Sequence, residues 1–120
     1  MTPPPLIDRA VLDELFDAIG PDGGRSVIEV FIKESRGYVA AIAAGAIPAA
    51  DAAQRDRARR AAHSLKSGAG QIGAAALSAA ARKVEGAVEA GETDLGQVAT
   101  SLQGCAAETF AVLAQLLAQK

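Results

Sequence analysis

The chain has 120 residues and a mass of 12.1 kDa, which corresponds to one domain at the usual size of about 100 to 200 residues. Half of the residues are apolar, yet the aromatic ones are three phenylalanines and one tyrosine, and about a quarter of the chain is alanine. Alanine is the strongest helix former, whereas β and α/β folds need more β-branched and aromatic residues. The net charge of −2 argues against the strongly basic surface that is typical of nucleic-acid binding. The composition therefore favours an all-α protein that does not bind nucleic acid.

The first residues of the sequence do not resemble a signal peptide. Residues 1–5 include three prolines, and we expect a disordered or extended lead before a single helical domain over residues 6–120. The start has no basic and apolar signal peptide, and no run reaches the ~20 apolar residues of a membrane helix. We expect a cytoplasmic protein without a membrane partner, in which the lone Cys105 is a small core side chain.

Apolar residues recur at helical spacing in five segments, which are separated by glycine, proline or capping residues. The first expected helix runs from about Asp8 to Ile19, and the second carries an apolar stripe from Val27 to Ile42 and ends near Gly45. The third runs from about Ala50 to Ile72 and the fourth from about Ala74 to Ala90. The fifth begins after a cap at Thr93 or Asp94 and carries an apolar stripe from Leu95 to Leu116. Short links between them favour an antiparallel up-and-down four-helix bundle with an additional short N-terminal helix.

The expected third helix carries the only histidine, His63. A wheel at 100° per residue places it opposite a complete apolar stripe, which consists of Ala58, Ala61, Leu65, Gly68, Ala69 and Ile72. The histidine therefore faces water, and its simplest interpretation is an ordinary solvated side chain. Its own face also holds Asp56, Arg59, Arg60, Lys66, Ser67 and Gly70.

The neighbours of His63 favour a reactive role. Cations lie one turn to either side, and the glycines that follow each cost about 1 kcal/mol of helix propensity relative to alanine. These glycines are explained by close packing at Gly68 and Gly73 and by open access to the imidazole at Gly70. A neutral imidazole nitrogen is a good nucleophile near pH 7, and a phosphoryl group on it would find a cation in Lys66 and a hydroxyl in Ser67.

The run from Ala62 to Ala74 resembles the signature of histidine-containing phosphotransfer (HPt) domains, the intermediates of two-component phosphorelays. The family pattern has a histidine, an apolar residue two positions later, lysine at three, glycine or serine at four, small residues beyond and glycine at ten. This chain matches it from His63 to Gly73. The resemblance covers about residues 6–118, and Ser67 followed by Gly68 reverses the order of many members, which leaves open which hydroxyl contacts the phosphoryl group.

The resemblance implies that His63 takes a phosphoryl group from a phospho-aspartate of a receiver domain and passes it to another receiver aspartate. Lys66 and Ser67 would support the phosphoryl group. A polar residue of the next helix can orient the histidine ring in relatives, and the matching position is Glu85, which could instead be a solvated surface residue. Such a protein is a stoichiometric phosphocarrier rather than a turnover enzyme.

The expected partners are response-regulator receiver domains and a hybrid or other sensor histidine kinase. We expect docking around His63 on exposed small and apolar residues of the first three helices, with Arg59, Arg60 and Gln71 at the interface. The sequence has no nucleotide loop or acidic Mg²⁺ cluster, so no intrinsic cofactor is expected and the receiver would supply Mg²⁺. One histidine and one distant cysteine are too few for a metal site.

Two alternatives remain at this point. One is a helical adaptor that never carries phosphate, and the other is the phosphoacceptor domain of a larger chemotaxis-type kinase. Because no catalytic domain follows the last expected helix in this sequence, we expect a stand-alone protein. We expect a monomer, because the apolar stripe of that helix is used inside the bundle.

Overall fold

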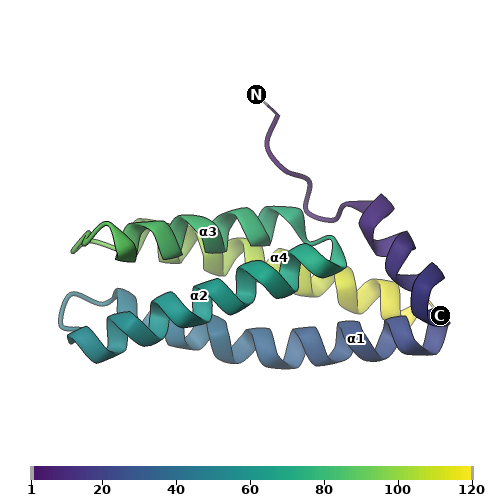
Figure 1. Cartoon of the computed structure of the whole chain (residues 1–120), viewed down its shortest axis with the longest axis horizontal. Coiled ribbons are helices and arrows are strands. Elements are labelled where there is room, and N and C mark those ends of the chain that lie inside the picture. Colours follow the sequence, from purple (N-terminus) through teal and green to yellow (C-terminus); the bar gives the residue numbers. More distant parts are fainter. Residues whose placement is uncertain (1, 120) are drawn as a thin grey trace.

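The computed structural model describes residues 2–119, and it consists of four helices (Figure 1). These are α1 (Arg9–Ala46), α2 (Ala52–Ile72), α3 (Ala75–Glu89) and α4 (Gly96–Ala118). No strand occurs among the described residues. The expected all-α bundle is confirmed.

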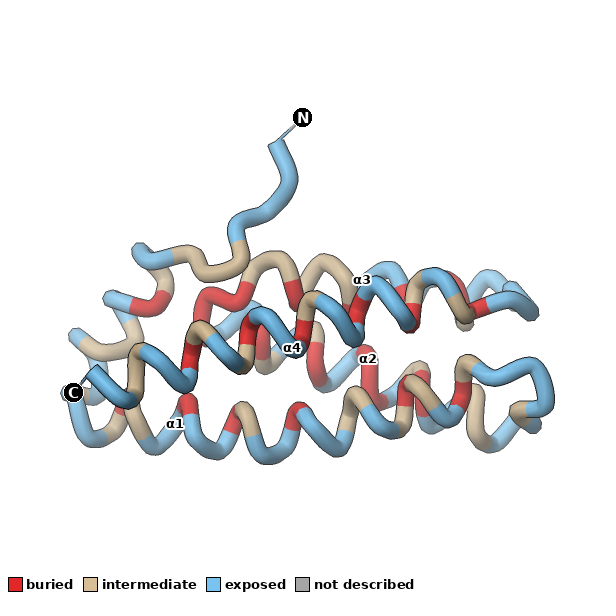
Figure 2. The backbone as a smooth tube through the Cα atoms, turned by 180° about the vertical axis from the view of Figure 1, so that it is seen from behind, coloured by how far each residue is buried: buried red, intermediate tan, exposed pale blue. Residues whose placement is uncertain are grey.

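The helices form a closed antiparallel ring in which α1 packs on α2, α2 on α3, α3 on α4 and α4 on α1. Buried residues line the inside of this ring along its whole length (Figure 2). The core is made mainly of alanine, leucine and isoleucine; Ile28, Leu65, Leu77 and Leu102 are each fully buried. Within residues 2–119, no helix is both long and apolar enough to cross a membrane.

The expected additional N-terminal helix corresponds to the first part of α1, which a kink separates from the rest of the helix. Gly20 interrupts the helical backbone with φ 79° and ψ 171°, and Pro21 follows inside the helix. A positive φ suits glycine, and proline starts a helical turn without needing a hydrogen bond for its missing N–H. The chain therefore bends at Gly20, and the segment before it lies across the end of the bundle (Figure 1).

Hydrogen bonds to side chains fix the starts of the helices. Asp51 caps α2 in a reciprocal capping box with Gln54, so this helix begins two residues later than expected. The N-cap of α4 is Leu95 rather than Thr93 or Asp94. The Asp94 carboxylate nevertheless accepts a hydrogen bond from the first helical N–H, that of Gly96, at 3.1 Å.

The link between α2 and α3 is held by the N-terminal segment. Gly73 ends α2 with φ 86°, and its carbonyl accepts a hydrogen bond from the Asp8 N–H at 2.7 Å. The Pro5 carbonyl accepts from the N–H of Ala76 at 2.9 Å. Residues 2–5 are exposed and form neither helix nor strand, and the Pro5 carbonyl attaches them to the start of α3. Met1 lies outside the described residues.

Candidate functional site

The single histidine lies on the solvent side of α2, as the helical wheel predicts. Its side chain is 60% exposed, whereas Ala58, Leu65 and Ala69 on the opposite side of the helix are buried. The apolar stripe thus holds α2 on the core by its inner face and leaves the imidazole of His63 open to an incoming group.

Glu85 joins the histidine to the neighbouring lysine. Its Oε2 lies 2.7 Å from Nδ1 of His63, and its Oε1 accepts a hydrogen bond from Nζ of Lys66 at 2.7 Å. Glu85 is only 8% exposed, so the alternative of a solvated glutamate is wrong. Each carboxylate oxygen therefore serves one donor from α2, and the carboxylate itself comes from α3.

The charge of this carboxylate is stabilised by its partners. The hydrogen bond from Lys66, which is the largest influence, and the one from His63 lower the pKa of Glu85, although burial acts in the opposite direction. Glu85 is therefore ionised at neutral pH, when a carboxylate can only accept hydrogen bonds. It follows that Nδ1 of His63 carries the shared proton and that Nε2 of the neutral ring keeps its lone pair.

The small residues after His63 differ in what surrounds them. Ser67 and Gly70 are exposed, which leaves open space beside the imidazole. A Cβ atom on Gly68 would lie 3.6 Å from the Phe31 ring, an ordinary contact, so close helix packing does not require glycine there. A Cβ atom on Gly73 would lie 2.6 Å from the Asp8 carbonyl oxygen, 3.2 Å from Cβ of Val11 and 3.3 Å from the Leu12 nitrogen, so the start of α1 packs closely on this glycine.

The expected docking residues lie on two sides of the histidine. Arg59 and Arg60 both form ion pairs with Asp56, each at 3.1 Å, so part of their positive charge is neutralised within α2. Gln71 borders a cavity of about 330 Å³ between α1 and α2. The other side of this cavity carries Val27 and Val30, which are 37% and 53% exposed.

The sequence reasoning missed three residues around this site. Val30 lies outside the apolar stripe of its helix, so the helical periodicity does not single it out, although the side chain is an exposed apolar one. Ser78 donates a hydrogen bond at 2.9 Å to the Lys66 carbonyl, and Arg82 borders a cavity next to it. Both lie on the face of α3 that carries Glu85, at spacings of seven and three residues, and this periodicity was the signal that could have found them.

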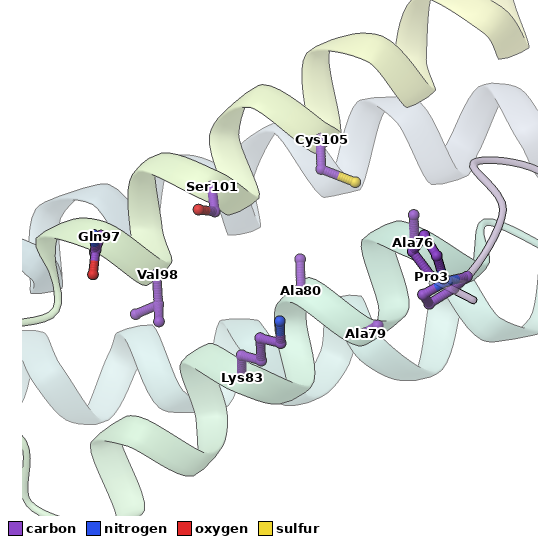
Figure 3. Close-up of a pocket in the computed structure, with 10 residues that line it drawn as sticks. Pro3, Ala76, Ala79, Ala80, Lys83, Gln97, Val98, Ser101 and Cys105 are labelled. Atoms are coloured by element: carbon purple, nitrogen blue, oxygen red, sulfur yellow. The ribbon is translucent and has the colours of Figure 1, made fainter. Parts of the chain in front are cut away.

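A further cavity of about 390 Å³ lies between α3 and α4, on a different side of α3 (Figure 3). Lys83 and Cys105 point toward it, and the prolines of the N-terminal segment close one end. Burial raises the pKa of the Cys105 thiol, which keeps it protonated and unreactive at neutral pH. This cavity holds none of the residues that the sequence singles out for chemistry.

Comparisons with known proteins show the family and the fold of this chain. The family model described as the Hpt domain matches residues 26–119, so the chain belongs to the Hpt domains, the histidine phosphotransfer components of two-component phosphorelays. A crystal structure of histidine-containing phosphotransfer protein B (HptB) from Pseudomonas aeruginosa PAO1 is similar, with a TM-score of 0.86 at 20% sequence identity over 97% of each chain. At that identity the likeness concerns the fold. The search of curated proteins found no significant match.

Proposed function

We propose that His63 is the phosphoacceptor of this domain and that Nε2 is the atom that carries the phosphoryl group. The observation that supports this most directly is the pairing of Nδ1 with the buried carboxylate of Glu85. This contact assigns the proton to one ring nitrogen and leaves the other free on an exposed surface. His63 also lies within residues 26–119, which the Hpt family model matches, and its place in the run that resembles the family signature supports the same assignment.

In the forward step, the lone pair of Nε2 attacks the phosphorus of a phospho-aspartate on a receiver domain. The bond between phosphorus and the aspartate oxygen breaks, an N–P bond forms, and the aspartate leaves as a carboxylate. With the phosphoryl group on Nε2 and the proton on Nδ1, the imidazole ring carries a positive charge. The adjacent Glu85 carboxylate stabilises this charge. In the second step a receiver aspartate attacks the phosphorus, and the electron pair of the N–P bond returns to Nε2.

Lys66 serves both states of this cycle. In the structure its ammonium group binds Glu85, but its side chain is 26% exposed and belongs to the same helix face as His63. An ammonium group has three donors, so Lys66 can contact a phosphoryl oxygen without releasing the carboxylate. Ser67, one turn after His63 and exposed, offers a hydroxyl to the same group.

The receiver domain docks over α1 and α2 around His63. The exposed Val27 and Val30 and the cavity beside Gln71 provide the apolar part of this surface, and the two arginines provide a net positive rim with Asp56. An apolar centre with charged groups at the edge is typical of transient interfaces. We expect the protein to act as a monomer with one receiver at a time.

The Mg²⁺ that phosphoryl transfer requires is expected to come from the receiver. The sensor kinase system supplies the phosphoryl groups. Each molecule of this protein accepts one phosphoryl group and returns to its unphosphorylated state when it passes that group on. It acts as a stoichiometric carrier, without its own ATP site.

The test is a transfer assay in which purified wild type and His63→Gln are mixed with a panel of receiver domains labelled through hybrid kinases. We expect acid-labile and base-stable label on the wild type and none on the variant. Label that persists on His63→Gln would refute the assigned acceptor. A wild type that takes no label from any donor would instead support the silent adaptor.

A further inference from the structure

Arg82 on α3 borders a cavity of about 300 Å³ that opens between α2, α3 and the start of α1. Gly70 of α2, Ser78 of α3 and Asp8, the N-cap of α1, form part of its lining. The cavity shares Gly70 and Gly73 with the run that resembles the family motif, but the proposed function gives Ser78 and Arg82 no role. The side chains of Asp8, Ser78 and Arg82 make its lining more polar than that of the valine-lined cavity between α1 and α2.

The cavity lies on the same face as the phosphoacceptor. Gly70 follows His63 by seven residues, which is two turns or about 10.5 Å along the helix axis. On α3, Arg82 precedes Glu85 by three residues and follows Ser78 by four, so the three side chains share the face that meets α2. A phosphoryl group on His63 would therefore lie near the edge of the cavity and not inside it.

Arg82 differs from the other cations around the site in having no carboxylate partner. Lys66 is paired with Glu85, while Arg59 and Arg60 share Asp56. Within residues 2–119, Arg82 makes neither a hydrogen bond nor an ion pair, and it is exposed.

The carboxylate of Asp8 is the other charge in this cavity. One of its oxygens accepts the N–H of Ala10 at the start of α1. It is therefore already used in capping that helix.

We propose that Arg82 is a docking residue that receives an acidic side chain of the receiver domain at the α3 edge of the interface. This inference rests on the proposed function, which brings a receiver over His63. An unpaired guanidinium provides directed donors for a carboxylate, and a charge at the edge of an interface acts on association and its salt dependence. Arg82 thus extends the docking surface from α1 and α2 to α3.

The test compares Arg82→Glu with Lys83→Glu, because both reversals change the net charge equally. Lys83 is the neighbouring residue but points toward the cavity between α3 and α4 (Figure 3). Single-turnover transfer is measured from the labelled receiver that reacts fastest with the wild type, over a range of carrier concentrations. This gives a maximal rate and a half-saturating concentration for each variant, and circular dichroism checks that each is folded.

We expect Arg82→Glu to raise the half-saturating concentration about fivefold at 50 mM salt, with the maximal rate unchanged. The difference should shrink at 0.5 M salt, since the Debye length then falls to about 4 Å. Lys83→Glu should behave like the wild type.

Three results would overturn the inference. The first is that Arg82→Glu has the same half-saturating concentration and maximal rate as the wild type. The second is that Arg82→Glu and Lys83→Glu change the half-saturating concentration equally. The third is that Arg82→Glu lowers only the maximal rate, which would place Arg82 on the phosphoryl group. A wild type that accepts no label removes the proposed function and this inference with it. A normal wild type with a silent Arg82→Glu removes the inference alone.

Discussion

Replacing Glu85 by glutamine tests the contact that assigns the proton of His63. In the wild type each oxygen of Glu85 accepts one donor, Nδ1 of His63 or Nζ of Lys66, both at 2.7 Å. Glutamine has the same shape but one oxygen and one NH₂ group, which cannot accept a hydrogen bond. One of the two donors must therefore lose its acceptor in Glu85→Gln.

The size of the effect follows from the exposure of the partners. A hydrogen bond to a charged group contributes about 1.5–3 kcal/mol. Because the His63 side chain is 60% exposed, water competes, and we reduce the expected loss to about 1 kcal/mol. This corresponds to roughly a fivefold change in an equilibrium between the two ring tautomers. Transfer to Nε2 should slow by about the same factor, because less of the ring has its lone pair there.

Two measurements check this prediction together. Nitrogen-15 NMR of the His63 ring reports which nitrogen carries the proton, and single-turnover transfer reports the rate. Glu89→Gln is the matched control, since Glu89 lies one turn further along α3 and is exposed. An unchanged tautomer ratio and rate in Glu85→Gln, or an equal effect of Glu89→Gln, would refute the positioning role.

Three more outcomes are expected. Lys66→Ala should slow transfer by about three- to tenfold while the unfolding midpoint stays within a few degrees, because its ammonium group is partly solvated; unchanged kinetics would contradict its role. Gly73→Ala should lower the free energy of unfolding, measured in urea, by about 3 kcal/mol. The reason is that φ is 86° at this position and that a Cβ atom would meet the Asp8 carbonyl. A loss below about 1 kcal/mol would show that the turn relaxes. Because the folded-state pKa of Glu85 is lowered, its ionisation stabilises the fold at neutral pH, and this contribution is lost as the pH falls below about 4. The stability difference between wild type and Glu85→Gln should therefore shrink from pH 7 to pH 3, and a difference that grows on acidification would reverse the assigned sign.

The fold was largely predictable because its signals are local. Helical spacing of the apolar residues predicts five helical segments, the first two of which belong to α1, and the wheel of the segment that forms α2 places His63 in solvent. The bend at Gly20 and Pro21 is also visible in the sequence. Whether the segments on its two sides count as one helix or two depends on the backbone angles of a single residue, which periodicity does not determine.

The site was less predictable because its contacts join two helices. The pairing of His63 with Glu85 depends on the relative height of α2 and α3, and only the family resemblance pointed to it. The ion pairs of Arg59 and Arg60 with Asp56 were within reach of sequence reasoning, since spacings of three and four residues bring such side chains together on one helix.

The exposed valines illustrate a different limit. Val27 belongs to the apolar stripe and is nevertheless 37% exposed, because that stripe is wider than the contact between α1 and its neighbours. An apolar pattern shows which face of a helix lies inward, but not how far a partner helix covers it.

The two-residue link between α2 and α3 determines where along the bundle the reactive pair can form. His63 lies ten residues before Gly73, and Glu85 lies eleven residues after Ala74. Each arm of this helical hairpin is therefore about 15–17 Å long, and the pair meets because the arms are nearly equal. Adding one residue to either arm would shift its side chain by about 1.5 Å and rotate it by about 100°. The separation of 22 residues between histidine and glutamate thus determines whether the two side chains meet. A substitution leaves this spacing unchanged, whereas a single inserted residue between them would break the contact.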